Sequence, residues 1–390
     1  MLLSIVIPTR NRQEYAANLL SALNASREED FEVIVHDNSE LTQLSDIVAG
    51  LDDQRIRYHH APERLNMHQN FDRAVDLARG EYVCVIGDDD GVLVSPALAA
   101  LRKAKAQSAE ALLTELYLYA WPGVLHKIWG DMGGPLDSSP AFPGQAERIL
   151  APIDALEDLY RRGAVGGLGL LPRVYHGYVA RTSLAGLKAQ CGTYFPGASP
   201  DIANAVGLTK FVSRLLFDPA ATIISGHSPK SGGGSGAAGR HHSELDDARH
   251  LPASSIQQWD KRLPRFWCGP TVYAQSALEA ARAVNVCPAT AFNYLNVCAA
   301  CLAFEPPVYR HHIHRAIELN SQPNSFAWVL IANHLLQISA RRAHVFLRNI
   351  RMRTLGSART THFNDMNEII QHITHKSKAA LGQRESLVRQ

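Results

Sequence analysis

The chain lacks an excess of one charge, a regular cysteine framework and an internal repeat. Its 39 lysines and arginines nearly balance its 37 aspartates and glutamates, so the overall charge does not indicate a nucleic-acid partner. Six cysteines in 390 residues predict free thiols and a reducing compartment. Cys298 and Cys301 form a C-x-x-C motif, but the sequence has no second cysteine pair that would complete a zinc site. We therefore expect two thiols on a helix face.

Long hydrophobic runs are also missing. No segment is long and apolar enough to cross a membrane. The apolar stretch Leu2–Ile7 is too short for a signal peptide, and no basic region precedes it, so it is predicted to be a first strand. We therefore expect a cytoplasmic protein, and a peripheral contact with the inner face of the membrane stays open.

The composition that remains is that of a globular protein, with 46% hydrophobic and 19% charged residues. Its length allows one large domain and a smaller region. We predict a first domain over residues 1–239, with halves at 1–110 and 111–239 and a mobile Ser/Gly-rich loop at its end. Residues 240–390 are predicted to be a helical C-terminal region, with helices over 271–284, 288–304, 325–336 and 343–350.

The first third of the chain alternates between strand and helix patterns. Apolar runs at 2–7, 31–36, 56–60 and 82–86 are separated by stretches with helical spacing, which predicts a mostly parallel sheet covered by helices. Polar clusters follow three of these strands, namely Pro8–Arg12, Asp37–Ser39 and Asp88–Asp90. If the first and fourth strands are neighbours, as in doubly wound sheets, all three clusters converge on one cleft.

The cluster Asp88–Asp90 directly follows the apolar run Tyr82–Ile86. Three adjacent carboxylates repel one another, and a divalent cation such as Mg²⁺ or Mn²⁺ relieves that repulsion because these ions prefer oxygen ligands. Such an ion keeps positions that a diphosphate can fill. The alternative is a solvated acidic turn without a ligand.

Three segments together resemble family 2 glycosyltransferases of the GT-A fold, of the bacterial polysaccharide type. They are Ser4–Arg12, Val33–Ser39, and Gly80–Val83 running into Gly87–Asp90. The similarity extends over roughly residues 1–230 and is densest in 1–100. It implies an α/β fold with a Rossmann-like nucleotide-binding mixed sheet, a nucleotide-sugar donor, a divalent metal and, usually, inversion at the anomeric carbon. The commoner family pattern has an Asp where this chain has Gly87, so either Asp89 is the principal metal ligand or Asp88 and Asp90 form a D-x-D.

The resemblance implies a role for each polar cluster. Mn²⁺ or Mg²⁺ would be held by Asp88, Asp89 and Asp90, with His227 completing the shell. The donor, for which a UDP-sugar is favoured, would be bound by a wider set of residues: Pro8, Thr9, Arg10, Arg12, Asp37, Asn66, Asn70, Asp88, Asp89 and Lys230. Simpler alternatives are a solvated first-turn position for Arg12, a turn cap with Ser39 for Asp37, a helix N-cap for Asn66 and a plain interdomain linker for the loop that carries Lys230.

An inverting transferase also needs a base that accepts the proton of the acceptor hydroxyl. Asp201 follows Ser199-Pro200 at a predicted helix start, where the family commonly presents an acidic residue, and is the candidate. A helix N-terminus stabilises a carboxylate, so a capping role fits equally well. Glu157 and Asp158 are the next candidates. Trp121 would either stack on a sugar or pack under its loop.

The predicted activity is transfer of a sugar to a glycan or lipid-linked acceptor in surface polysaccharide synthesis. A nucleotidyltransferase would place a Gly-rich loop with a lysine after the first strand, where this chain has Pro8–Arg12. A non-catalytic nucleotide- or partner-binding module is the other alternative, since the C-terminal region is basic. A homo-oligomer is a further expectation. The arginines of this region would also serve a peripheral membrane contact, and they are Arg341, Arg342, Arg348, Arg351, Arg353 and Arg359.

Overall fold

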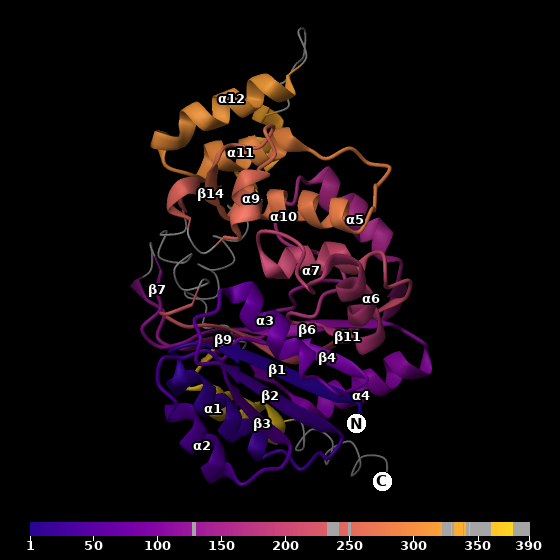
Figure 1. The fold of residues 1–390 in the computed structure, drawn as a ribbon, viewed down its shortest axis with the longest axis vertical. Helices are drawn as coiled ribbons and strands as arrows, with labels where there is room; N and C mark the ends of the chain where they lie inside the picture. The colour runs from indigo at the N-terminus through magenta and orange to yellow at the C-terminus, as the bar shows by residue number, and fades with distance from the viewer. Residues whose placement is uncertain are drawn as a thin grey trace.

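The computed structural model describes residues 1–126, 130–231, 242–248, 251–321, 329, 331–337, 339–340, 343 and 360–376. In these parts a sheet-bearing half lies below a helical half (Figure 1). The predicted mixed sheet flanked by helices and the helical C-terminal region are confirmed. Among the described helices, none has the length and apolar character needed to span a bilayer.

Four parallel strands form the part of the sheet that the sequence predicted. They are β1 (Leu3–Thr9), β2 (Phe31–Asp37), β3 (Ile56–His60) and β4 (Tyr82–Val85). Their order is β4-β1-β2-β3, so the first and fourth strands are neighbours as expected. Every residue of β1, β2 and β4 is buried, which explains their continuous apolar runs.

The other part of the sheet is mixed. The short strand β11 (Tyr178–Ala180) runs antiparallel to both β4 and β6 (Ala111–Ala120). The long strand β12 (Leu215–His227) is parallel to β6 and antiparallel to β5 (Gly91–Val92) and β10 (Arg148–Leu150). Because β5 follows the acidic turn directly, its pairing brings the end of β12 beside Asp88–Asp90.

Helices cover both faces of the sheet, as the alternation predicted. One face packs against α1 (Gln13–Asn24), α2 (Gln43–Leu51) and α4 (Val94–Ala106). The opposite face packs against α3 (Met67–Asp76) and α6 (Arg181–Cys191). Successive strand residues point to opposite faces, so each strand contributes to both cores.

The end of the described chain returns to the sheet. Strand β15 (Thr360–His362) pairs with β9 (Pro135–Asp137), and β9 in turn pairs with β6. Residues 366–376 are helical and lie beside α1, at the opposite end of the molecule from α12 (Figure 1). Phe363, Met366 and Ile369 are buried in the core that α1 and α4 share. The expected division at residue 240 did not anticipate this return.

The helical half is built mainly from residues between 151 and 321. Its helices are α5 (Pro152–Arg161), α7 (Pro200–Leu208), α9 (Ala253–Gln257), α10 (Gly269–Ala283), α11 (Tyr294–Phe304) and α12 (Arg310–Asn320). The short strands β13 (His242–Glu244) and β14 (Phe266–Cys268) pair with each other, as do β7 (Leu125–His126) and β8 (Gly130–Asp131). Single 3-10 turns are formed by Leu245–Asp247 and Pro307–Tyr309.

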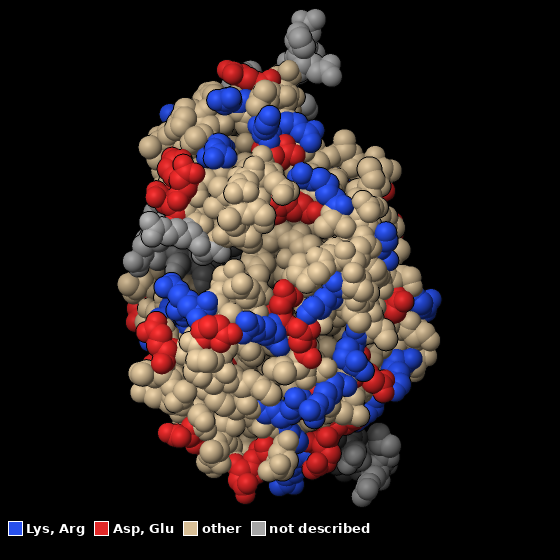
Figure 2. All heavy atoms as spheres, in the orientation of Figure 1, with Lys and Arg blue, Asp and Glu red and all other residues tan. Residues whose placement is uncertain are grey.

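Helix α10 confirms the helix predicted over 271–284, and α11 begins six residues after the predicted start at 288. All six cysteines are free, and Cys298 and Cys301 are buried on α11. Within the segment predicted as a helix over 325–336, residues 329 and 331–336 are described and are helical. Most of the segment predicted as a helix over 343–350, and the basic residues from Arg341 to Arg359, lie outside the described residues. On the face drawn in Figure 2, positive and negative side chains are interspersed, in line with the balanced composition.

Candidate active site

The carboxyl ends of β1, β2 and β4 meet at one edge of the sheet, where the sequence predicted a cleft. The turn that follows β4 is buried there: Asp88, Asp89 and Asp90 are 2%, 3% and 1% exposed. The alternative of a solvated acidic turn is therefore wrong. Burying three carboxylates is costly unless each has partners, so their contacts define what the site can do.

Asp90 points into the protein and both of its oxygens accept hydrogen bonds. The backbone amide of Gly226 donates to Oδ1 at 2.7 Å and that of Gly87 donates to Oδ2 at 2.7 Å. His176 Nε2 lies 2.7 Å from Oδ2, and the Tyr175 hydroxyl donates to the same oxygen at 3.2 Å. Burial raises the pKa of Asp90, but His176 and the two amides outweigh it, and the net shift is downward.

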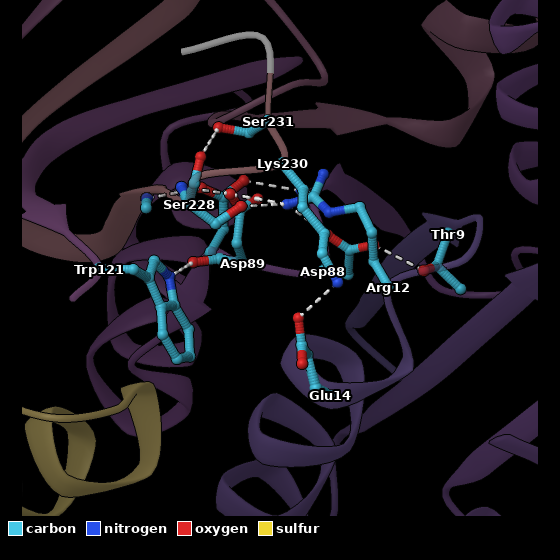
Figure 3. A network of polar contacts seen from close by, with 12 residues as sticks. Thr9, Arg12, Glu14, Asp88, Asp89, Trp121, Ser228, Lys230 and Ser231 are labelled. Carbon is cyan, nitrogen blue, oxygen red and sulfur yellow. Dashed lines mark hydrogen bonds and ion pairs between the residues drawn. The ribbon is translucent and has the colours of Figure 1, made fainter. Parts of the chain in front are cut away.

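Asp88 and Asp89 instead face Arg12, which stands just before the first turn of α1 (Figure 3). Arg12 Nη2 lies 2.9 Å from Asp88 Oδ1 and 2.7 Å from Asp89 Oδ2. The Thr9 hydroxyl donates to Asp88 Oδ2 at 2.6 Å. Burial raises the pKa of Asp88 to about 7, although Arg12 opposes the shift. Within the described residues, Asp88 Oδ1 receives no hydrogen bond despite the nearby guanidinium.

The end of β12 closes over these carboxylates. The amide of Ser228 donates to Asp89 Oδ2 at 2.9 Å, and Arg12 Nη2 donates to the Ser228 hydroxyl at 2.8 Å. A Cβ at Gly226 would overlap the carbonyl of Asp89, so glycine is required for this close approach. Trp121 Nε1 donates to that same carbonyl at 2.8 Å.

Trp121 is packed under the site. Its ring lies against Tyr15 and Tyr119, with centroids 4.8 Å and 5.4 Å away, and only 7% of the residue is exposed. Trp121 thus anchors the backbone of Asp89. Its ring is packed against neighbouring side chains, as the second of its two predicted roles expected, and is not exposed for stacking on a sugar.

Asp37, at the end of β2, is fully buried and holds a loop beside β1. Its Oδ1 accepts from the amide of Ser39 at 2.8 Å and its Oδ2 accepts from the Tyr58 hydroxyl at 2.9 Å. The Ser39 hydroxyl in turn accepts from the amide of Asn11, whose φ of 53° is left-handed. The turn cap with Ser39 is therefore present, and it ties the ends of β1 and β2 together.

Helix α3 supplies the predicted asparagines in two different settings. Asn70 is buried; its Nδ2 donates to the carbonyl of Thr9 at 3.3 Å and its Oδ1 lies 2.5 Å from His36 Nδ1. Asn66 is exposed and caps α3 through a reciprocal bond with Gln69, as the simpler alternative expected.

Among the remaining predicted donor residues, Pro8 is buried within β1, whereas Arg10 and Lys230 pair with acidic side chains outside the acidic turn. Arg10 is 3.6 Å from the exposed Glu40, and Lys230 Nζ is 3.0 Å from Glu14 Oε1. His227 is the last residue of β12. Among the described residues, no group of three or more His, Cys, Asp or Glu side chains is placed to hold a metal ion. The predicted set of Asp88, Asp89, Asp90 and His227 is thus not gathered around one point.

Asp201 stands in the first turn of α7, and α7 lies in the part of the helical half nearer the sheet (Figure 1). Its Oδ1 accepts from the Ser199 hydroxyl at 2.5 Å and from the amide of Ile202 at 2.9 Å, and its Oδ2 accepts from the Tyr273 hydroxyl at 2.9 Å. It is partly exposed. Burial raises the pKa of Tyr175, and the charges of Asp90, Asp89 and, least, Asp201 add to that upward shift.

Sequence reasoning missed the segment Arg173–His176, which links these two places. The carbonyl of Val174 accepts from Val85 at the end of β4, and the amide of Val174 donates to Asn204 on α7. Arg173 is buried, and burial lowers its pKa to about 10. His176 adopts a left-handed φ of 57°. No motif marks these residues; an isolated Tyr-His pair before a glycine was the only signal.

Comparison with known proteins now adds to this geometry. Residues 4–114 match the family described as Glycosyl transferase family 2. The chain carries a family 2 glycosyltransferase domain. The match contains β1 to β4, the acidic turn, Arg12 and Asp37, and it stops before Asp201.

The glycosyltransferase domain is similar to curated bacterial enzymes. It is 31% identical over 139 residues to the GalNAc(5)-diNAcBac-PP-undecaprenol beta-1,3-glucosyltransferase of Campylobacter jejuni, covering 35% of this chain and 44% of that protein. It is 31% identical over 120 residues to the abequosyltransferase RfbV of Salmonella typhimurium, covering 30% and 36%. A putative colanic acid biosynthesis glycosyl transferase of Escherichia coli, WcaA, is 34% identical over 91 residues, or 23% and 33%. The chain therefore spans less than half of the length of each relative.

Solved structures overlap with the fold only loosely. Staphylococcus aureus TarS 1-349 in complex with UDP-GlcNAc gives a TM-score of 0.45 at 13% identity over 88% of this chain and 92% of that chain. A mannosyltransferase from Pyrobaculum calidifontis, in complex with GDP-Man and Mn²⁺, gives 0.39 at 13% identity over 87% and 86%. Overlaps at this level do not assign a donor or a metal to this chain.

Proposed function

We propose that this chain is an inverting, metal-dependent glycosyltransferase that moves a sugar from a nucleoside-diphosphate donor to a glycan or lipid-linked acceptor. The observation that carries the proposal is the meeting of Thr9, Arg12, Asp37 and the pair Asp88–Asp89 at one edge of the sheet. This edge lies inside the segment that matches family 2. The similar curated proteins make or extend bacterial glycans, which supports a place in surface polysaccharide synthesis.

The donor would lie along the ends of β1, β2 and β4. Asp37 and the loop it braces, with Pro8, Thr9 and Asn70 forming the floor, would border the nucleoside. Arg12, with Arg10 and Lys230 at the rim, would meet the diphosphate, because guanidinium and ammonium groups bind phosphate oxygens. Asn66, one residue before α3, would reach the nucleotide only from the rim. A UDP-sugar remains the favoured donor.

The residues present fit a divalent metal such as Mn²⁺ or Mg²⁺. Asp88 Oδ1 is buried without a hydrogen bond within the described residues, and Asp89 Oδ2 lies on the same side of Arg12. Two carboxylates suffice for an ion of this kind when substrate phosphates complete its coordination. We assign that role to Asp88 and Asp89, and leave Asp90 to hold the turn in place. Bound there, the ion would stabilise the charge that grows on the leaving diphosphate.

Asp201 is the proposed base. Its two oxygens are oriented by Ser199, the amide of Ile202 and Tyr273, so the carboxylate has a fixed direction. Its partial exposure leaves it able to take the proton of an acceptor hydroxyl. With Asp201 as base, a single displacement would invert the anomeric carbon, because the acceptor would attack on the face opposite the departing diphosphate. Six free cysteines agree with a reducing compartment, and we place the reaction in the cytoplasm.

A donor screen tests the proposal. The full chain would be incubated with UDP-, GDP- and dTDP-sugars, with and without Mn²⁺, and thermal stabilisation and release of the free nucleotide would be measured. We expect one nucleotide series to stabilise the protein and to be turned over only with metal. Asp89→Asn should abolish turnover, whereas the remote exposed change Asp246→Asn should not. Metal-dependent turnover that survives in a folded Asp89→Asn protein would exclude this assignment.

A further inference from the structure

A single nitrogen of Arg12 joins the three groups that line the acidic edge. Its Nη2 is within 3 Å of Asp88 Oδ1, Asp89 Oδ2 and the Ser228 hydroxyl, at 2.9, 2.7 and 2.8 Å (Figure 3). The guanidinium carbon also lies 5.4 Å from the centre of the Tyr15 ring. Only 20% of the Arg12 side chain is exposed. The guanidinium is therefore held firmly between the two carboxylates.

This position conflicts with a cation at the same carboxylates. A divalent ion bound to Asp88 and Asp89 would share its oxygen ligands with a fixed positive charge in a poorly solvated site, where like charges repel strongly. The guanidinium of an arginine stays protonated in proteins, so Arg12 keeps its positive charge here. Arg12 and a metal ion thus compete for one pair of carboxylates.

The described residues provide few further ligands that would favour the metal ion over Arg12. In the described part of the chain no third His, Cys, Asp or Glu joins Asp88 and Asp89 in a metal-binding group. Asp90 is already used by four donors. A nucleoside diphosphate changes the balance in two ways, because its oxygens complete the coordination of the ion and also give the guanidinium an anionic partner.

We propose that Arg12 keeps free divalent cations off Asp88 and Asp89, and that it yields these carboxylates when a nucleoside diphosphate arrives. Metal and nucleotide then bind interdependently, and Arg12 is the residue that couples them. This inference rests on the proposed function, since it takes the donor to be a nucleoside diphosphate. Ser228 has a supporting role, because its hydroxyl helps to hold the guanidinium in the blocking position.

Mn²⁺ binding measures the coupling without any turnover. Electron paramagnetic resonance of free Mn²⁺ would be recorded during titration of the full chain, first alone and then with UDP and with GDP. The wild-type protein should bind Mn²⁺ weakly alone and about tenfold more tightly with the matching nucleotide, a typical coupling between two sites. Arg12→Gln should bind Mn²⁺ about tenfold more tightly than wild type without nucleotide, and the nucleotide should then add little.

Two matched variants locate the effect. Arg102→Gln removes a guanidinium on α4 that is paired with Asp30 rather than with the acidic turn, and it should leave Mn²⁺ affinity unchanged. Arg12→Gln combined with Asp88→Asn should lose the gain, which would place the added affinity at Asp88. If Arg12→Gln is poorly folded, Ser228→Ala provides the same test, with a smaller gain in Mn²⁺ affinity expected.

An Arg12→Gln protein that binds Mn²⁺ no more tightly than wild type would overturn the inference, as would an absence of Mn²⁺ binding in both proteins. The outcome is separable from that of the donor screen. A gain of Mn²⁺ affinity without turnover of any nucleotide sugar would keep the role of Arg12 and remove the transferase assignment. Turnover of a nucleotide sugar without a gain of Mn²⁺ affinity in Arg12→Gln would keep the transferase assignment and remove the role of Arg12.

Discussion

His176 Nε2 lies 2.7 Å from Asp90 Oδ2, and this contact joins the loop before β11 to the turn after β4. His176 adopts a left-handed φ of 57°, a conformation that costs free energy for a residue with a Cβ. The neighbouring Tyr175 stacks on the imidazole, with ring centroids 4.2 Å apart, and donates to the same carboxylate. Asp90 is thus the point at which β4, β12 and the 173–176 segment are fastened together.

Asp90→Asn should destabilise the fold. The amide group would present donor hydrogens to a pocket that already contains the amides of Gly87 and Gly226, so at least one buried donor would lose its acceptor. Breaking a buried charge pair in this way costs roughly 3–5 kcal/mol of unfolding free energy. Urea denaturation measures the change. The exposed Asp246→Asn should stay within about 0.5 kcal/mol of wild type, and an unchanged midpoint for Asp90→Asn would refute the structural role of Asp90.

Asp201→Asn should separate catalysis from folding. The amide oxygen of Asn can still accept from the amide of Ile202, so the start of α7 should survive, but the side chain can no longer take a proton. Loss of a general base lowers kcat by about 10²- to 10⁴-fold. Tyr273→Phe removes only the bond to Oδ2 and should cost less. Steady-state kinetics with the donor found in the screen checks this, and a kcat for Asp201→Asn within a factor of two of wild type would remove Asp201 from the mechanism.

The sequence predicts the donor half well because local pattern and global fold agree there. Continuous apolar runs identify β1, β2 and β4, and the polar residues that follow them are forced together once β1 lies between β2 and β4. The convergence of Thr9, Arg12 and Asp88 follows from that order alone. The individual hydrogen-bond partners of these residues do not follow from the strand order, because the bond from Arg12 to Ser228 joins residues 216 positions apart in the chain.

The sequence predicts the rest less well because long-range contacts decide it. Asp88, Asp89 and Asp90 are identical in residue type, yet two face Arg12 and one faces inward, and only the approach of Gly226 and His176 distinguishes them. Tyr273, which orients Asp201, comes from a helix 72 residues away. The sequence of residues 360–376 also does not predict that they return to the large sheet, because an amphipathic pattern indicates a buried face but not the core against which that face packs.

Acid should weaken the fold through His68. This imidazole on α3 is buried, its Nε2 lies 2.8 Å from the carbonyl of Gly197, and its Nδ1 has no hydrogen bond within the described residues. Burial lowers the pKa of His68 below the value of about 6.5 that an unfolded chain would show. Protonation therefore favours the unfolded chain, so the stability is fully present above about pH 6.5 and is lost as the pH falls below it.

The check is the unfolding free energy at pH 7.5 and at pH 5.5. The loss of stability that His68 causes between these values, taken as the difference between wild type and His68→Gln, should be at most about 1.4 kcal/mol for each pH unit. Asp88, whose pKa is raised to about 7, acts in the opposite direction in both proteins. His68→Gln keeps a donor for the carbonyl of Gly197 but does not titrate, so its loss should be smaller. His36 and His59 contribute in the same direction as His68 in both proteins, because burial also lowers their pKa values. Equal losses in wild type and His68→Gln would show that His68 does not contribute.

Met366 should be essential to the stability of the sheet-bearing half, although it lies more than 100 residues beyond the predicted end of that domain. It is fully buried, and it packs so closely on Gly91, just after the acidic turn, that a Cβ there would be 2.6 Å from its sulfur. Met366→Ala would leave a cavity between residues 366–376 and β5, which typically costs about 2–5 kcal/mol. The exposed His375→Ala on the same helix is the matched control and should change little. If residues 360–376 were an independent appendage, Met366→Ala would leave both the unfolding midpoint and nucleotide binding as in wild type; because Met366 supports Gly91, we expect both to fall together.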